Sequence, residues 1–198
     1  MIAVIDFGAG NLRSIQRALE ENGAEVIITD DPATVARADR AVLPGDGHAK
    51  SAMQYLHDKG LVDAIGEVVA AGKPFLGVCV GMQLLFDDQE EGPTQGLGLL
   101  EGAVKLIPAG VKVPQMGWNI VDFRPNTPLA HLRRSHYYFV HSYAPDATND
   151  SDIAGETDYG IRFPSVVIRD NIWGTQFHPE KSGEDGLSLL RSWVEWEP

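Results

Sequence analysis

The chain has 198 residues, of which 43% are hydrophobic and 22% are charged, and its formal net charge is −12. This length and composition exclude a disordered chain and predict one domain over residues 1–198 with a sizeable core. The acidic balance disfavours nucleic acid and anionic membranes, and no apolar run approaches the ~20 residues of a membrane span, so we expect a cytoplasmic protein.

The first half of the chain alternates short apolar runs with helical patterns. Asp31-Pro32 is typical of an N-cap followed by proline at the first helical position, and Ser51 is a second candidate N-cap. Strands are expected at residues 2–8, 24–30, 40–45 and 73–78, and helices after residues 11, 31 and 51 and over 61–72 and 81–88. This alternation predicts a parallel sheet covered by helices on both faces.

The second half is rich in β-forming residues separated by turns. Apolar segments at 103–107, 137–145, 153–160, 165–171 and 172–178 predict strands, and residues 183–196 predict a closing helix. The predicted fold class is therefore α/β, an open and mostly parallel sheet flanked by helices, with a β-rich extension in the second half.

No cofactor or metal motif is convincing. Gly8-Ala9-Gly10 follows the first strand like a dinucleotide fingerprint, but Arg13 stands where the third glycine belongs. We therefore expect a tight turn there, no cofactor and no metal.

The single cysteine, Cys79, lies between two glycines in Gly77-Val78-Cys79-Val80-Gly81. This is the spacing of the nucleophile elbow G-x-S-x-G, in which a sharp turn between strand and helix exposes the central side chain. N–H groups at the start of the helix favour the thiolate, and the N–H of Val80 can stabilise an oxyanion. A free cysteine is also commonly a small buried hydrophobe, so the elbow alone leaves both interpretations open.

A thiol nucleophile needs a base, and the base needs an orienting group. Among six histidines, His178 stands out because it begins the segment His178-Pro179-Glu180. Residues two apart on an extended backbone face the same side, so Glu180 can hold the ring of His178. This segment by itself is more typical of a surface turn.

The cysteine elbow combined with H-P-E at the end of a β-rich stretch resembles the class I glutamine amidotransferases, which have a flavodoxin-like fold. Further segments are similar to the glutaminase subunits of imidazole glycerol phosphate synthase: "IDFGAGNLRSI", "LPGDGHAKSAM", "GVCVGMQLLF", "VPQMGWN", "YYFVHSY" and "GTQFHPEKSGEDGLSLL". The resemblance extends from Ile5 to about Leu190.

The resemblance implies L-glutamine as substrate and a role for individual residues. Cys79 would attack the side-chain amide, His178 would transfer the proton, and Glu180 would orient His178. Backbone N–H groups at Val80, Asp46 and Gly47 would form the oxyanion hole. The implied glutamine-binding residues are Gly45, Gln83, Glu91, His141, Ser142 and Tyr143.

The resemblance also implies a partner, a (β/α)8-barrel cyclase subunit that forms a heterodimer with the glutaminase and receives its ammonia. Hydrolysis without that partner would be wasteful, because free ammonia becomes ammonium in neutral water. The segments near the implied interface contain Asn11, Arg13, Met116, Trp118, Asn119, Tyr138 and Lys181.

The chain departs from the family pattern at two positions. Gln115 replaces the histidine of the family segment P-H-M-G-W-N, and Asp46 stands where an apolar residue is common in the P-G-x-G loop. An acidic side chain beside a forming oxyanion would hinder it unless the carboxylate points to solvent.

Two alternative functions remain open. One is another class I glutaminase, which would feed anthranilate or pyridoxal phosphate synthesis. The other is an inactive relative that serves as a binding module, which the presence of Cys79, His178 and Glu180 disfavours.

Overall fold

The structure, a computed structural model, describes residues 1–147 and 149–198. Its helices are α1 (Leu12–Glu21), α2 (Pro32–Arg37), α3 (Ala49–Asp58), α4 (Leu61–Ala70), α5 (Val80–Gln83) and α6 (Gly183–Glu195). Its strands are β1 (Ile2–Ile5), β2 (Val26–Thr29), β3 (Arg40–Gly45), β4 (Phe75–Cys79), β5 (Phe86–Gln89), β6 (Thr94–Gln95), β7 (Leu100–Leu106), β8 (Gln115–Phe123), β9 (Arg134–His141), β10 (Tyr143–Ala147), β11 (Ile153–Asp158), β12 (Arg162–Arg169) and β13 (Ile172–Thr175).

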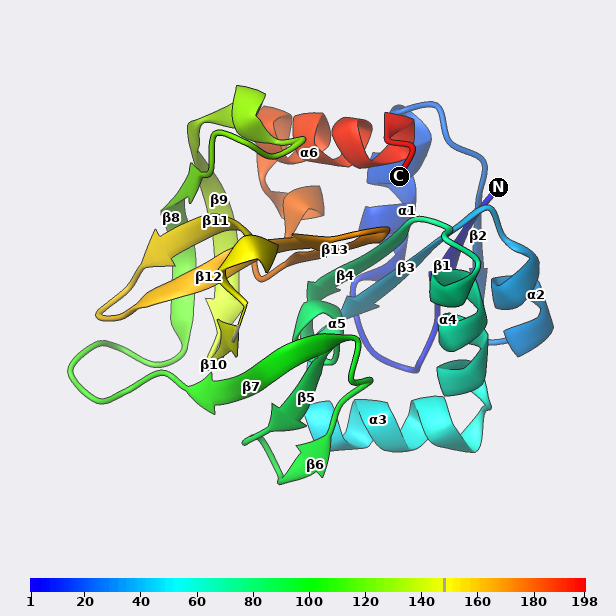
Figure 1. Ribbon diagram of the computed structural model, residues 1–198, viewed down its shortest axis with the longest axis horizontal. Coiled ribbons are helices and arrows are strands. Elements are labelled where there is room, and N and C mark those ends of the chain that lie inside the picture. The colour runs from blue at the N-terminus through cyan, green and yellow to red at the C-terminus, as the bar shows by residue number, and fades with distance from the viewer. Residues whose placement is uncertain (148) are drawn as a thin grey trace.

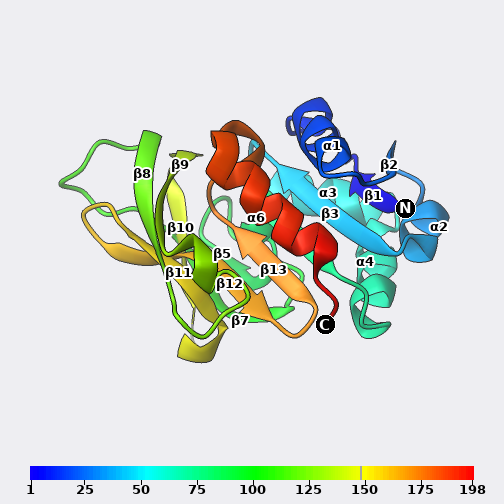
Figure 2. The same cartoon turned by 90° about the horizontal axis from the view of Figure 1, so that it is seen from above.

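A nine-stranded sheet in the order β2-β1-β3-β4-β13-β12-β11-β8-β9 forms the centre of the molecule. The pairs from β2 to β13 are parallel, and their order is the 2-1-3-4-5 order of flavodoxin-like sheets. The pairs from β13 to β9 are antiparallel, so the predicted β-rich extension continues the same sheet. Helices α1 and α6 cover one face and α3 and α4 the other (Figures 1 and 2). The α/β class is confirmed.

A second sheet of four strands, in the order β10-β7-β5-β6, lies below the first in Figure 1, on the side of α3. The expected strand 137–145 is divided between the two sheets, because β9 ends at His141 and β10 begins at Tyr143. Ser142 is therefore the point at which the chain leaves one sheet for the other.

The core lies between the large sheet and its helices. Every residue of β1 and β4 is buried, as expected for parallel strands covered on both faces. Helix α6 contributes Leu189, Leu190 and Trp193, each with 0% exposed surface. Burial of one such side chain stabilises a fold by about 1.5–3 kcal/mol.

Two predicted helix boundaries were wrong. The helix expected over 81–88 ends at Gln83, and residues 86–89 form β5, which pairs with β6 and β7. A short apolar run does not distinguish strand from helix by its periodicity, and here pairing decides. Helix α3 begins at Ala49 rather than after Ser51, because the Glu91 carboxylate accepts the N–H of Ala49 at 2.8 Å.

The predicted cap at Asp31 is confirmed, since its carboxylate accepts the N–H of Thr34 at 2.9 Å. Strand β8 was not predicted as a strand. Within the described part of the chain, no helix has the length and hydrophobicity needed to cross a membrane. The cytoplasmic location stays a prediction.

Candidate active site

Cys79 is the last residue of β4 and precedes the short helix α5. Its backbone has φ 56° and ψ −110°, a conformation that a residue other than glycine rarely adopts and that is typical of strained functional turns. A Cβ on Gly77 would lie 2.6 Å from the carbonyl oxygen of Gly81, and a Cβ on Gly81 would collide with the carbonyl oxygen of Leu43. The two glycines therefore allow the turn to close against its neighbours.

His178 and Glu180 form a buried pair after β13. Nδ1 of His178 lies 2.9 Å from Oε1 of Glu180, and their side chains are only 4% and 3% exposed. The carboxylate accepts the Nδ1–H, so a neutral ring presents an unprotonated Nε2. Among the described residues, Nε2 has no hydrogen-bond partner.

Cys79 lies close enough to His178 to raise its pKa, and because Nδ1 is engaged by Glu180, Nε2 is the ring nitrogen left for the sulfur. Burial acts to lower the pKa of His178, but the nearby Cys79 and Glu180 more than offset it and raise that pKa to about 10. The 98 residues between Cys79 and His178 are bridged because β13 pairs in parallel with β4, so both strands end at the same sheet edge. This geometry permits a thiolate–imidazolium pair.

The pKa of His178 predicts how stability changes with pH. A folded-state pKa of about 10, above the ordinary 6.5, stabilises the folded protein below pH 6.5, and this contribution is lost as pH rises toward 10. Glu180→Gln removes one anionic partner with little change in shape. Between pH 6.5 and pH 10, the unfolding free energy of this variant should therefore fall by less than that of the unmodified protein, with a difference on the order of 1 kcal/mol. Urea denaturation at both ends of this pH range checks it. A fall of the same size in both proteins would contradict it.

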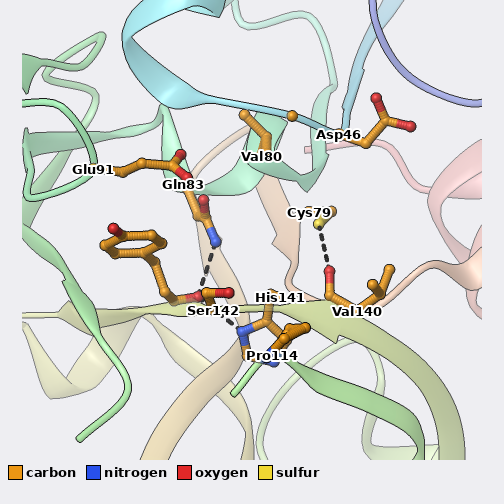
Figure 3. Close-up of a pocket in the computed structure, with 11 residues that line it drawn as sticks. Asp46, Cys79, Val80, Gln83, Glu91, Pro114, Val140, His141 and Ser142 are labelled. Atoms are coloured by element: carbon orange, nitrogen blue, oxygen red, sulfur yellow. Dashed lines mark hydrogen bonds between the residues drawn. The ribbon is translucent and has the colours of Figure 1, made fainter.

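A cavity of about 220 Å³ opens beside the sulfur. Figure 3 shows Cys79 facing Val140 of β9 across it, with the sulfur 3.8 Å from the Val140 carbonyl oxygen. The lining residues come from both sheets, from α5 and from the loops that follow β3, β5, β7 and β9: Asp46, Gly47, Cys79, Val80, Gln83, Glu91, Pro114, Val140, His141, Ser142 and Tyr143. The structure thus gathers most of the predicted oxyanion and glutamine-binding residues around one thiol.

Gly45 is the predicted binding residue that does not line this cavity. It pairs with Cys79 in the sheet, and a Cβ at this position would lie 2.9 Å from both the Gly81 nitrogen and the Val80 Cβ. Gly45 therefore packs against the turn that carries Cys79, where the backbone of β3 approaches α5.

Gln115 accounts for one departure from the family pattern. Its side chain lies 3.0 Å from Nε2 of His141, while Nδ1 of His141 donates to the Tyr143 carbonyl at 2.8 Å. A neutral ring then needs a donor at Nε2, whereas the Gln115 atom at 3.0 Å is Oε1, so the amide is assigned in the flipped orientation: its nitrogen donates to Nε2 and gains the partner that it otherwise lacks. Burial and the cation at His178 lower the pKa of His141 to about 4, with the Tyr143 hydrogen bond opposing, so this ring is neutral at pH 7.

Asp46 accounts for the other departure. Its Oδ1 accepts the N–H of Gly10 at 2.8 Å, and Figure 3 shows the carboxylate directed away from Cys79. The charge therefore stands outside the space beside the sulfur, and the side chain joins the loop after β3 to the loop after β1.

The predicted interface residues lie outside the cavity. Met116 and Trp118 are 63% and 57% exposed on one face of β8. Tyr138 packs edge-on against Trp118, with ring centroids 6.2 Å apart. Asn11 and Arg13 are exposed at the start of α1, whereas Asn119 and Lys181 are half-buried.

Three residues near the site lie in the quoted family segments but were assigned no role from the sequence: Pro114, Val140 and Gln176. Gln176 directs its side-chain nitrogen at the Cys79 sulfur from 3.8 Å. Within residues 1–147 and 149–198, no three His, Cys, Asp or Glu side chains are grouped to hold a metal.

The fold and the thiol site together define a class of protein. A model of one protein family, Glutamine amidotransferase class-I, matches residues 3–195. The chain belongs to this family, and the predicted resemblance and enzyme class are confirmed.

Curated relatives narrow the class further. Proteins named imidazole glycerol phosphate synthase subunit HisH are 46% identical in Geobacillus thermodenitrificans and 47% identical in Moorella thermoacetica. Each match covers 98% of this chain, and 95% and 94% of those proteins respectively. The prediction that the chain is a relative of these glutaminase subunits is therefore confirmed.

Solved structures show the same fold at lower identity. A crystal structure of a glutamine amidotransferase has a TM-score of 0.78 at 19% identity and covers 96% of both chains. The structure of PurLQS from Thermotoga maritima has a TM-score of 0.74 at 21% identity, over 98% of this chain and 96% of that one.

Proposed function

We propose that residues 1–198 act as one glutaminase domain, the ammonia-producing subunit of an imidazole glycerol phosphate synthase. It hydrolyses L-glutamine and delivers ammonia to a (β/α)8-barrel cyclase subunit. The partner then makes imidazole glycerol phosphate and an aminoimidazole carboxamide ribotide for histidine biosynthesis. One observation supports the proposal most strongly. The Cys79 thiol lies beside a small cavity and near His178, whose Nδ1 is held by the Glu180 carboxylate and whose Nε2 has no partner among the described residues.

The first half of the reaction is acylation of the thiol. His178 takes the thiol proton, and the sulfur of Cys79 bonds to the side-chain amide carbon of glutamine. The Val80 N–H and a backbone N–H of the Asp46-Gly47 loop stabilise the resulting oxyanion. The C–N bond then breaks, His178 returns the proton to the departing nitrogen, and ammonia leaves a glutamyl thioester.

The second half is hydrolysis of the thioester. His178 takes a proton from water, and the oxygen attacks the thioester carbon. The C–S bond then breaks as His178 returns the proton to the sulfur, which gives glutamate and the free thiol of Cys79. Glu180 stabilises the imidazolium in both halves from 2.9 Å. Its side chain is buried, so the attraction is little screened by water.

Glu91 and Gln83 support glutamine as the ligand. Both line the cavity, and the anionic Glu91 suits the ammonium group of an amino acid. The amide oxygen of Gln83 can accept from the same group, because both amide hydrogens are engaged by Tyr143 and Gln176. The curated relatives also favour this function over a glutaminase of anthranilate or pyridoxal phosphate synthesis, because their shared name is that of the imidazole glycerol phosphate synthase subunit.

The cyclase is proposed to dock on the face of β8 that carries Met116 and Trp118. These two side chains are exposed and apolar, and the neighbouring Tyr138 connects them to the site. The Tyr138 carbonyl accepts the His178 N–H at 2.9 Å, and the Tyr138 N–H donates to Ser182 Oγ at 3.0 Å. A partner bound to this face would therefore contact Trp118, which packs against Tyr138, and the Tyr138 backbone is hydrogen-bonded to His178.

An assay with and without a barrel cyclase tests the function. We expect slow glutamate release from the free subunit and a large increase with a cyclase that carries its nucleotide ligand. Anthranilate and pyridoxal phosphate synthase partners should produce no increase. Full activity of the free subunit, unchanged by the cyclase, would count against the proposal.

Trp118→Ala should weaken this docking. A large exposed aromatic at an interface commonly contributes about 2 kcal/mol or more, so we expect the Kd for the cyclase to rise by roughly 30-fold. Titration of glutaminase activation measures it. Ile27→Ala is the matched control, because Ile27 is an exposed apolar residue of β2, at the opposite edge of the large sheet. Equal affinity of the two variants would remove β8 from the interface.

A further inference from the structure

Gln176 lies beside Cys79 at the end of the neighbouring strand. It follows the last residue of β13, and the preceding pair in the parallel ladder is Thr175 with Val78, so Gln176 comes level with Cys79. Its side chain has 0% exposed surface. Water therefore does not reach this amide, and it has to find its hydrogen-bond partners inside the protein.

The partners fix which way the amide points. The Tyr143 carbonyl can only accept, so the atom of Gln83 that lies 3.0 Å from it is the nitrogen. The same nitrogen donates its second hydrogen to Oε1 of Gln176 at 3.1 Å. The nitrogen of Gln176 is then left to face the sulfur of Cys79, at 3.8 Å.

The amide of Gln83 is held in turn by its surroundings. Gln83 is 3% exposed, and the side chain of Gln89 donates to its main-chain carbonyl at 2.7 Å. The orientation of Gln176 is therefore set by a series of hydrogen bonds: the Tyr143 carbonyl fixes the nitrogen of Gln83, and that nitrogen fixes the oxygen of Gln176. It does not depend on an arbitrary choice between amide oxygen and nitrogen.

We propose that Gln176 belongs to the reaction site: held by Gln83, its amide donates an N–H to the Cys79 sulfur and stabilises the thiolate. An N–H donor favours the charged form of its acceptor. The inference rests on the proposed role of Cys79 as nucleophile, and it adds a residue that touches the reacting atom.

Gln176 acts against an opposing contact. The Val140 carbonyl lies 3.8 Å from the same sulfur and accepts only, so it favours the protonated thiol. The remaining titratable groups around the cavity are Asp46, Glu91, His141 and Tyr143, besides His178, whose pKa the nearby Cys79 helps to raise. Within the described residues, removal of Gln176 leaves the His178 imidazole as the only side chain that favours the thiolate.

The geometry also couples the binding residue to the nucleophile. Both side-chain hydrogens of Gln83 are engaged, one by Tyr143 and one by Gln176. A displacement of Gln83 when the cavity fills would therefore reorient the donor that faces the sulfur.

Alkylation of the thiol by iodoacetamide tests the inference in the free protein, with neither glutamine nor cyclase. Gln176→Glu keeps an oxygen for Gln83 but turns a second oxygen toward the sulfur. Gln176→Met keeps the length and removes both hydrogen bonds. We expect alkylation at pH 7 to slow by about tenfold in either variant, the size of effect that a lost hydrogen bond to a charged group gives. The pH profile of alkylation should move toward higher pH.

Thr175→Val is the matched control. Thr175 is buried in the same strand, and its hydroxyl donates to the Phe177 carbonyl at 3.1 Å without contact to Cys79. This variant should lose stability but keep the alkylation profile of the unmodified protein. Thermal melting reports folding for all three variants, and Gln176→Met decides if Gln176→Glu does not fold.

A folded Gln176 variant with an unchanged alkylation profile would overturn the inference. So would a shift of the same size in Thr175→Val, since the shift would then reflect a lost buried hydrogen bond of any kind. Neither result bears on whether Cys79 hydrolyses glutamine, so failure of the inference and failure of the proposed function are distinguishable.

Discussion

Cys79→Ala is expected to reduce glutamate release to the rate of the uncatalysed reaction. The sulfur makes the covalent bond in the proposed mechanism, and alanine leaves the amide carbon without a nucleophile at the elbow. The cavity, His178 and Glu180 should persist, because both glycines that close the turn are unchanged. The measurement is glutamate production with the cyclase present. Undiminished turnover would end the thioester mechanism.

Cys79→Ser separates the chemical effect from the structural one. Alanine leaves the buried amide nitrogen of Gln176 without its sulfur acceptor, which costs about 1–3 kcal/mol for an unsatisfied polar group. A serine hydroxyl retains an acceptor there. We therefore expect both variants to lose activity, and Cys79→Ala to melt at a lower temperature than Cys79→Ser.

His178→Asn is expected to lower kcat/KM for glutamine by at least about 1,000-fold, because loss of a general acid–base that activates a nucleophile has effects of this size. Asparagine can place its amide nitrogen near the position of Nδ1. It can thus still donate to Glu180, whose carboxylate is buried and would otherwise be left unpaired. What asparagine lacks is the Nε2 that is left for the sulfur.

The contrast with His178→Ala makes this result specific. Alanine should lose both activity and stability, since the Glu180 carboxylate then has no partner in a buried site. Asparagine should lose activity with a much smaller change in melting temperature. Substantial activity in His178→Asn would show that a different group takes the thiol proton.

Local motifs account for what the sequence predicted well. The elbow around Cys79 and the segment from His178 to Glu180 each encode their geometry within five residues. A turn that only glycine permits, and a carboxylate two positions from a ring, leave a readable spacing. Their approach to each other depends on the pairing of β4 with β13, and the resemblance to a family supplied that step.

Contacts between distant segments account for what the sequence did not predict. Gln176 meets Cys79 across 97 residues, and the effect of Gln115 depends on His141, which is 26 residues away. Motifs based on short spacings along the chain cannot predict contacts between residues this far apart in the sequence. Strand β8 was missed because Gly117 interrupts its alternation, and pairing with β9 and β11 overrides that weak local signal.

The Asp46 carboxylate points away from the sulfur, a feature that the sequence alone could not predict. A carboxylate in the oxyanion loop would oppose a developing negative charge if it faced the sulfur. Instead it accepts the Gly10 N–H at 2.8 Å and is exposed. The same residue can therefore offer its backbone to the site while its charge stays outside.

The most direct measurement of the central claim is the mass of the protein after acid quench during turnover of glutamine. We predict that a fraction of the chains carries one added glutamyl group, and that peptide mapping locates it on Cys79. The group should be absent from Cys79→Ala. Steady release of glutamate with Cys79 never acylated, or with the glutamyl group on another residue, would contradict the account.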